Sequence, residues 1–408
     1  MPAGPRGRGE PLAYPFPRQN CLAPMPHTDL LAQDVMARVR MPSGDIAHLA
    51  VRHADVVRAL TDRRLSRRAM LTTSGGPRMT LADIDEPSLL GLDPPDHTRV
   101  RRLCAPAFRR PAVAALRDAV QTRVDRLLDR IESEPGPVDL NQALSLPLAN
   151  GILCDLLGVP QDHRAPLLHW SRQKLSLTSI PPHQARAGHQ ALRAHWSTLL
   201  FEGHLGEGLL ATLVAAHRAG RLGRPELLAT AVNLFVAGHV TTAATLTNGI
   251  LHLLIHRRQW RALCREPSLL ERAVHEILRY DTIADVGLPR LATADLHIGA
   301  TLVRAGEAVI PSHAHGGRDR SVFVAPDTFD ITRAPGPHLA FGHGPHRCVG
   351  AELALLELRT TLGTLALRLP DLSLAEPAGD LPFLNGSLIG GVARLPVTLS
   401  AAGHTPSR

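Results

Sequence analysis

One cysteine lies where its thiol could act as a metal ligand or a nucleophile. Cys348 belongs to residues 341–350, which read FGHGPHRCVG. The two glycines and the proline before Cys348 allow the tight backbone path that presents a thiol from a loop. Leucines downstream predict a buried helix from Val349 to about Leu367, so Cys348 would lie at a helix N-terminus. Unpaired N–H groups there favour a thiolate, which is the form of cysteine that binds haem iron.

A lone cysteine in a loop rich in Gly and Pro is usually inert. Here, however, the pattern F-G-x-G-x-H-x-C-x-G is matched at every fixed position. The segment resembles the cysteine-ligand loop of the cytochrome P450 family, of the soluble bacterial type. The resemblance implies a haem b group bound through the Cys348 thiolate, with Phe341 and Gly350 beside it, and O2 as co-substrate. It also implies the triangular fold of that family, mainly α with a smaller β-rich part.

Four basic side chains match family positions that hold the haem propionates. His97 and Arg101 are four residues apart on one face of a predicted helix, the spacing needed to bind a pair of carboxylates. Taken alone, each of the four would ordinarily belong to a solvated basic face. The resemblance implies that His97, Arg101, Arg290 and His346 contact the propionates.

A long uncharged stretch predicts a helix through the protein core. Residues 227–256 contain no Asp, Glu, Lys or Arg, and they are long enough to span a membrane. Their Asn, His and Thr side chains favour a buried core helix instead. Residues 237–242, which read AGHVTT, resemble the family's oxygen-binding segment. The resemblance places Ala237 beside the haem and Gly238, His239 and Thr241 at the catalytic centre.

Gly238 would let a flat cofactor or a diatomic ligand approach the backbone. Val240 stands where the family usually has Glu or Asp before the threonine. Valine cannot carry a proton, so protons would reach dioxygen through water, His239 or a substrate group. His239 is equally well explained as a packed core histidine.

A carboxylate and a guanidinium three residues apart match the E-x-x-R signature. Glu276 and Arg279 alone would be weak support, because surface ion pairs at this spacing are common. The resemblance implies that the two form a buried structural pair. Thr328 stands where many family members have an arginine that supports the pair, so this third partner is expected to be missing.

The resemblance also indicates which parts of the chain line the substrate pocket. Residues 62–92 are predicted to form a long loop, and residues 163–200 a mobile lid of helical composition broken near Pro181. Single residues placed at the pocket are Val240, Val286, Gly287, Leu288, Leu388 and Ile389.

Smaller patterns predict the elements around these sites. Residues 45–60 are predicted to form a strand followed by a short helix, and residues 112–158 two amphipathic helices. Short β-segments are expected at 288–292, 296–302 and 308–311. Residues 1–20 are expected to be a flexible lead without a signal peptide or membrane anchor, 21–400 a single domain, and 401–408 a flexible tail.

Charge and cysteine spacing constrain the partners. The 408 residues carry a net charge of +8, which suits an acidic protein, whereas no basic run with interleaved aromatics indicates nucleic acid. The five cysteines show no CxxC spacing, which is typical of a reducing cytoplasm. The resemblance implies electrons from an acidic ferredoxin or flavodoxin with its reductase, which alone would use NAD(P)H. The residues expected to bind that partner are Arg101, Arg102, Arg109, Arg110 and Arg347.

Three functions fit these patterns. The first is a monooxygenase that hydroxylates a small natural product of secondary metabolism. The second is an enzyme with the same haem that desaturates its substrate or couples it through C–C or C–N bonds, for example between aromatic or cyclic dipeptide units. The third is a haem-binding protein without turnover or, without haem, a cysteine hydrolase that uses Cys348 and a histidine.

Overall fold

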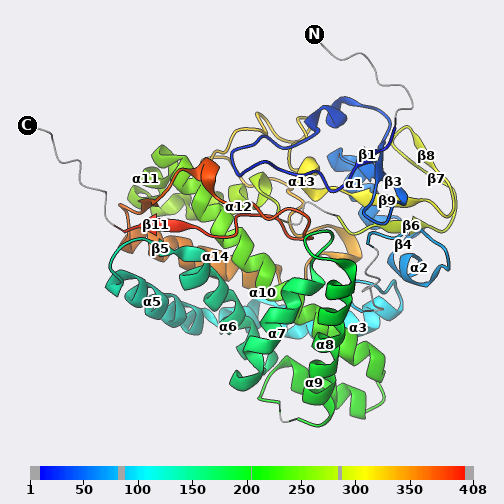
Figure 1. Cartoon of the computed structure of the whole chain (residues 1–408), viewed down its shortest axis with the longest axis horizontal. Helices are drawn as coiled ribbons and strands as arrows, with labels where there is room; N and C mark the ends of the chain where they lie inside the picture. Colours follow the sequence, from blue (N-terminus) through cyan, green and yellow to red (C-terminus); the bar gives the residue numbers. More distant parts are fainter. Residues whose placement is uncertain (1–9, 81–87, 204, 284–286, 400–408) are drawn as a thin grey trace, which may run out of the picture.

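A computed structural model describes residues 10–80, 88–203, 205–283 and 287–399. Helices make up most of the molecule, and the strands β1, β3, β4, β6 and β9 gather on one side of it (Figure 1). This arrangement confirms the predicted mainly α fold with a smaller β-rich part. The helices are α1 (His53–Thr61), α2 (Arg67–Thr72), α3 (Asp96–Cys104), α4 (Arg110–Ala114), α5 (Arg117–Ser133), α6 (Leu146–Leu157), α7 (Gln161–Lys174), α8 (Pro182–Phe201), α9 (Leu209–Arg218), α10 (Arg224–Ile255), α11 (Arg257–Arg265), α12 (Leu270–Tyr280), α13 (His313–Gly316) and α14 (Ala351–Arg368).

The uncharged stretch forms α10, which runs through the centre of the helical part (Figure 1). Pro225 lies in its first turn, and the Glu226 carboxylate accepts the Gly223 N–H at 2.9 Å, which together define its start. The helix packs against α6, α8, α9, α12 and α14. Its length and hydropathy would suit a membrane span, but 67% of its most apolar window is buried inside the protein. It is therefore a core helix, as predicted.

The β-rich part holds the segment that carries one predicted propionate ligand. A six-stranded sheet has the order β1-β2-β3-β9-β6-β4, in which β6 pairs antiparallel with β9 and Arg290 lies opposite Val309. Because β9 is fully buried, this pairing fixes both Arg290 and the start of α13. The strands are β1 (Leu12–Ala13), β2 (Ala37–Arg40), β3 (Ile46–Ala50), β4 (Leu65–Ser66), β5 (Val138–Asp139), β6 (Arg290–Ala292), β7 (Leu296–Ile298), β8 (Thr301–Val303), β9 (Ala308–Pro311), β10 (Ser373–Leu374) and β11 (Pro396–Thr398).

Most smaller elements agree with the sequence patterns. Residues 45–60 form β3 and α1, residues 112–158 contain α5 and α6, and the predicted lid consists of α7 and α8. Residues 62–92 are not one loop, however, because they include β4 and α2. The Ser66 hydroxyl accepts the Ala69 N–H and so caps α2, a signal that the surrounding Arg, Thr and Gly residues obscured.

The N-terminal segment is structured over more of its length than expected. Residues 1–20 were expected to be a flexible lead, yet β1 pairs in parallel with β2, and Tyr14 and Phe16 are buried. Burial of these two aromatic side chains against the sheet stabilises the segment, by about 1.5–3 kcal/mol for a fully buried large apolar side chain. The structure describes this segment from Glu10 onward.

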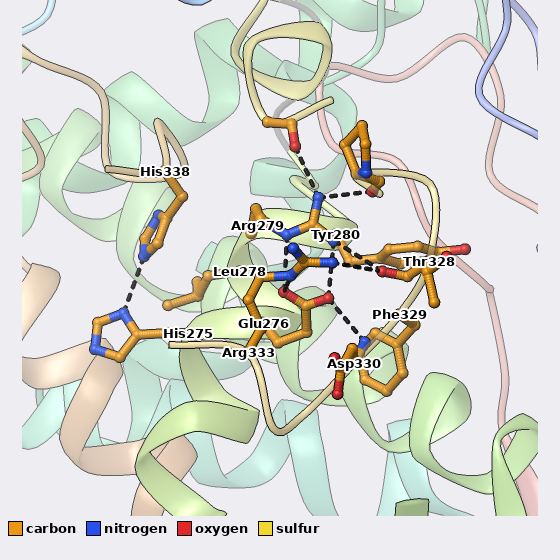
Figure 2. Close-up of polar contacts among 12 residues, drawn as sticks. His275, Glu276, Leu278, Arg279, Tyr280, Thr328, Phe329, Asp330, Arg333 and His338 are labelled. Atoms are coloured by element: carbon orange, nitrogen blue, oxygen red, sulfur yellow. Dashed lines mark hydrogen bonds and ion pairs between the residues drawn. The ribbon is translucent and has the colours of Figure 1, made fainter. Parts of the chain in front are cut away.

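The E-x-x-R pair is the centre of a buried ionic cluster (Figure 2). Arg279 donates from Nε and Nη2 to the two carboxylate oxygens of Glu276, both at 2.8 Å, and the two side chains are only 2% and 1% exposed. The expected lack of a third partner was wrong. Arg333 donates from Nε to Glu276 Oε2 at 3.1 Å and supplies the second guanidinium.

The two arginines also fix the loop that follows Phe323. Arg279 donates to the carbonyl oxygens of Pro326 and Thr328, and Arg333 donates to those of Val324 and Thr328. Thr328 thus takes part in the cluster through its main-chain carbonyl, and its side chain makes no ionic contact. The cluster ties α12 to the loop that leads toward residues 341–350.

We predict that Arg333 contributes to stability and that the Thr328 side chain does not. Arg333→Met should lower the free energy of unfolding by about 2–3 kcal/mol, because it removes hydrogen bonds to a buried carboxylate. Thr328→Ala should change it by less than about 0.5 kcal/mol. Urea unfolding of the two variants beside wild type measures both values, and equal losses would contradict the assignment.

Candidate functional site

One cavity brings together most of the residues predicted to hold the haem or to act in catalysis. It has a volume of about 310 Å³ and lies between α10 and residues 341–350, which are called the cysteine loop below. Predicted residues in its lining are His97, Arg101, Ala237, Gly238, Thr241, Phe341, His346, Cys348 and Gly350. Residues from three distant parts of the chain, α3, α10 and the cysteine loop, thus line a single space.

The cysteine loop has the strained path that its glycines predicted. Gly342 and Gly344 have φ angles of +66° and +70°, which disfavour any residue with a Cβ. A Cβ on Gly344 would also lie 3.0 Å from the Leu60 carbonyl oxygen. The Cys348 N–H donates to the Phe341 carbonyl at 2.8 Å and closes the loop. Helix α14 begins three residues after the cysteine.

Cys348 lies deep in the fold, yet its side chain keeps accessible surface, which opens into the cavity. Burial raises its pKa, whereas the Gly350 N–H, Arg101 and Arg347 act in the opposite direction by stabilising the thiolate. The Gly350 N–H is a donor of the kind predicted at a helix N-terminus, whereas the influence of the two arginines on the sulfur was not predicted. All three groups would reduce the cost of holding a negative sulfur inside the protein.

Basic side chains gather at one edge of the cavity. His97, Arg101 and His346 line it, and the rings of His97 and His346 lie 4.3 Å apart. Arg290 lines an adjoining surface cleft, which shares His346 with the cavity. Burial lowers the pKa of His97 to about 4 and that of His346 to about 2, and it lowers the pKa of Arg290 to about 10. In each case, burial of the basic group is the largest influence on its pKa and disfavours its charged form.

Two of these groups have buried nitrogen atoms without a hydrogen-bond partner among the described residues. They are His97 Nε2 and Arg290 Nε. Leaving such a group unpaired costs about 1–3 kcal/mol, so the site favours a ligand with acceptor oxygens. A ligand with carboxylates at its edge would satisfy both atoms.

One further histidine, not predicted from the sequence, lies at the same edge. His313 lines the cavity at the start of α13, and a Cβ on Gly342 would lie 3.8 Å from its Nε2. Burial, followed by the charge of Arg290, lowers the pKa of His313 to about 4. No motif marks this residue, since its position depends on the register between β6 and β9.

Helix α10 forms the opposite wall. The Thr241 hydroxyl donates to the Ala237 carbonyl at 2.5 Å, and the hydroxyls of Thr242 and Thr245 donate to the carbonyls four residues earlier at 3.1 and 2.9 Å. All three threonines line the cavity, and the helix remains continuous past them. Because each proton is directed back to the helix, the hydroxyl oxygens keep lone pairs for other groups.

Gly238 also has a packing contact that the sequence did not predict. A Cβ at this position would lie 2.8 Å from both Cδ atoms of Leu153, on the neighbouring α6. Gly238 also lines the cavity, so it lies both in the contact between α6 and α10 and at the site. A role for Gly238 in letting a ligand approach the backbone stays a prediction.

His239 does not line the cavity. Its Nδ1 donates to the Phe235 carbonyl at 2.7 Å, and its ring packs on Phe235 with 4.7 Å between centroids. Burial lowers its pKa to about 4, so it is neutral at pH 7. These contacts match the packed core histidine considered above, and a catalytic role for His239 stays a prediction.

The predicted substrate residues also lie outside the lining of this cavity. Val240 packs in the core, the Leu388 N–H pairs with the Leu175 carbonyl, and Val286 falls outside the described residues. Contact of a substrate with Val240, Gly287, Leu288, Leu388 and Ile389 therefore stays a prediction. Asn233, Thr282 and Ile283 line the cavity instead. Asn233 precedes Thr241 by eight residues, so helical periodicity alone could have indicated it.

Comparison with known proteins identifies the family. A family model described as Cytochrome P450 matches residues 266–374. Nocardicin C N-oxygenase of Nocardia uniformis subsp. tsuyamanensis is 38% identical over 395 residues, covering 96% of this chain and 99% of that protein. The chain belongs to the cytochrome P450 family.

Solved structures agree with this assignment and with the predicted P450 fold. The crystal structure of HinD with NMFT and NO superposes with a TM-score of 0.90 at 40% identity, over 96% of this chain and 100% of that chain. Mycinamicin VIII C21 methyl hydroxylase MycCI from Micromonospora griseorubida, bound to mycinamicin VIII, gives a TM-score of 0.88 at 34% identity, over 95% and 100% of the chains.

A cytochrome P450 uses haem iron bound by a cysteine thiolate, together with O2. The residues of this P450 fit such a group. Cys348 lines the cavity, and the unpartnered nitrogens of His97, in its lining, and of Arg290, in the adjoining cleft, could donate to the propionates. At Gly350 an added Cβ would meet only Phe108, at 3.9 Å, so the loop leaves room beside the sulfur.

We predict that the haem-free protein loses stability as the pH falls from about 6.5 to 4. The pKa values of His97 and His313 are about 4 in the folded protein, below the ordinary 6.5, so the unfolded chain binds more protons in this window. Each such histidine lowers the free energy of unfolding by up to about 1.4 kcal/mol per pH unit.

Urea unfolding at several pH values measures this slope. His97→Phe should reduce it, because the variant has one fewer buried imidazole. Bound haem should reduce it as well, since its carboxylates would stabilise the protonated histidines. A stability that stays constant between pH 6.5 and 4 would contradict the prediction.

Proposed function

We propose that this P450 oxidises a small natural product of secondary metabolism with O2, by hydroxylation. The observation that carries the proposal is the arrangement of Cys348 and the threonine-bearing face of α10 on opposite walls of one cavity. The names of nocardicin C N-oxygenase and of the MycCI methyl hydroxylase support insertion of a single oxygen atom.

Cys348 would hold the haem iron through Sγ. A thiolate-bound haem supplies activation of O2 and removal of hydrogen from the substrate. The Gly350 N–H and the guanidinium groups of Arg101 and Arg347 would stabilise the negative sulfur. His97, His346 and Arg290 would bind the propionates, with His313 beside them.

Thr241 would act on the opposite side of the cavity. Its hydroxyl oxygen accepts hydrogen bonds while its own proton stays on the Ala237 carbonyl, so it can orient a water or a substrate hydroxyl. Val240 cannot supply a proton, and the His239 ring is directed toward Phe235. Protons would therefore arrive through water held by Thr241, Thr242 and Thr245, or through a substrate group.

Electrons would come from a separate acidic ferredoxin or flavodoxin with its reductase, and NAD(P)H would act only through that system. The side chains of Arg102, Arg109, Arg110 and Arg347 are exposed and could bind such a partner. Arg101, also predicted for this surface, turns inward to the cavity and donates to the Arg347 carbonyl at 2.7 Å. The proposal places the protein in the cytoplasm with that redox system.

The test has two stages. The carbon monoxide difference spectrum of the reduced protein should show thiolate-bound haem, and its absence would overturn the proposal. A surrogate ferredoxin system should then convert a candidate natural product to one that is heavier by a single oxygen atom, measured by accurate mass. A product that has lost hydrogen, or two joined units without added oxygen, would instead establish desaturation or coupling.

We predict that Thr241→Val uncouples electron consumption from product formation. The substitution keeps the shape of the side chain but removes the hydroxyl oxygen, and loss of a positioned proton-transfer group typically costs a hundredfold or more, so a fall of at least about tenfold in product per electron pair is expected. Thr245→Val, one turn further along the same face, is the control and should have a smaller effect. Equal coupling in Thr241→Val and wild type would remove Thr241 from the catalytic centre.

A further inference from the structure

Four polar side chains, Arg359, Glu271, His275 and His338, form a hydrogen-bonded series that runs from the surface to the segment before the cysteine loop. Arg359 of α14 donates from Nε and Nη2 to the two carboxylate oxygens of Glu271 on α12, both at 2.6 Å. Glu271 Oε1 lies 3.1 Å from His275 Nε2, and His275 Nδ1 lies 3.0 Å from His338 Nε2. Figure 2 shows this last contact beside the Glu276 cluster. Side-chain exposure falls from 50% at Glu271 to 22% at His275.

His338, the inner end of this hydrogen-bonded series, lies beside the haem site. His338 comes three residues before Phe341, and the two rings are 6.0 Å apart. Phe341 lines the cavity, and its carbonyl accepts the Cys348 N–H. The remaining ring nitrogen, His338 Nδ1, is buried and has no hydrogen-bond partner among the described residues. Neither solvent nor a hydrogen-bond partner would therefore compensate for a gain or loss of hydrogen at this nitrogen.

The hydrogen bonds fix where the protons lie when His275 is neutral. Glu271 is a carboxylate, because its hydrogen bond to Arg359 lowers its pKa despite partial burial, so it can only accept. His275 Nε2 must then carry the hydrogen, and Nδ1 of a neutral His275 is an acceptor. His338 consequently donates from Nε2, which leaves its buried Nδ1 as a bare lone pair.

A proton added to His275 reverses this arrangement. His275 Nδ1 then carries a hydrogen and donates to His338 Nε2. Burial, followed by the charges of His275, Arg279 and Arg347, lowers the pKa of His338 to about 4, so His338 stays neutral. Its one hydrogen must move to Nδ1. One proton taken up near the surface thus converts the buried Nδ1 from an acceptor into a donor.

We propose that the pair of His275 and His338 couples protonation at the surface to the electron affinity of the haem. When His275 binds a proton from solvent, a positive charge appears on α12 and an N–H donor appears on His338, whose ring lies 6.0 Å from that of Phe341 in the cysteine loop. Both favour the additional electron that the ferredoxin or flavodoxin delivers to the iron. His275 and His338 act on the haem site as positioning residues, and the idea rests on the proposed haem-thiolate function.

Other charged groups around the pair keep their charge through the relevant pH range. They are Glu271 and Arg279 on α12, Arg359 on α14 and Arg347 in the cysteine loop. Carboxylates held by arginine and guanidinium groups do not titrate between pH 5 and 9, whereas histidine commonly does. In this proposal only His275 changes its proton content, whereas His338 keeps one hydrogen and changes the nitrogen that carries it.

A static tether between α12 and the cysteine loop is the competing explanation. The matched variant for separating the two is His275→Gln, because a glutamine amide can still bridge Glu271 and His338 but cannot bind a proton. A tether predicts that this variant behaves as wild type at every pH. Proton coupling predicts that it loses the pH response and keeps the fold.

The experiment uses the haem-loaded protein with 15N-labelled histidine. In the reduced, carbon monoxide-bound form, which is diamagnetic, 1H–15N correlation spectra from pH 5 to 9 report which nitrogen of His338 carries hydrogen. The hydrogen should move from Nε2 to Nδ1 as the pH falls. The reduction midpoint of the haem, titrated with dithionite in the presence of mediators, should rise over the same pH interval.

Both responses should disappear in His275→Gln while its thermal unfolding matches wild type. A single His338 tautomer from pH 5 to 9, or a reduction midpoint with the same pH dependence in wild type and His275→Gln, would overturn the proposal. The tautomer does not depend on any substrate or product. Failure of the function proposed above would appear separately, as a carbon monoxide spectrum without the thiolate band.

Discussion

The fold depends on burying a 32-residue helix that carries no charge over almost its whole length. An uncharged helix must be covered on every side, and α6, α8, α9, α12 and α14 supply that cover. This cover is close-packed: a Cβ on Gly238 would lie 2.8 Å from both Cδ atoms of Leu153 on α6. The face of α10 that carries Ala237, Thr241 and Thr245 lines the cavity. Packing around α10 thus decides where dioxygen and a substrate could bind.

The second wall of the cavity is the cysteine loop, whose path depends on backbone conformation and hydrogen bonds. In particular, this path depends on positive-φ glycines and on the hydrogen bond from the Cys348 N–H to the Phe341 carbonyl. Just before the loop, His338 contacts His275 of α12. Ionic and polar groups around α12 therefore serve both stability and the site. Glu276 binds two guanidinium groups on one side of this helix, while His275 contacts His338 on another (Figure 2).

Local patterns predicted the parts of the site that depend on short stretches of chain. Cys348, the face shared by His97 and Arg101, and the core helix follow from spacing within about 30 residues, and each appears where expected. Tertiary packing decided the remaining positions. The roles of Gly238, with Leu153, and of His313, through the register of β6 with β9, depend on partners far away in the sequence. The third ionic partner was missed because only the position of Thr328 was considered, whereas Arg333 reaches the same carboxylate from five residues further on.

The ionic cluster also has a consequence for sequence variation in the loop that it holds. Arg279 and Arg333 hold residues 324–328 by their carbonyl oxygens, which every amino acid possesses. Substitutions of the Val324 and Thr328 side chains would therefore leave these contacts in place. The Asp327 carboxylate is more constrained, because it pairs with Arg318 and Arg320.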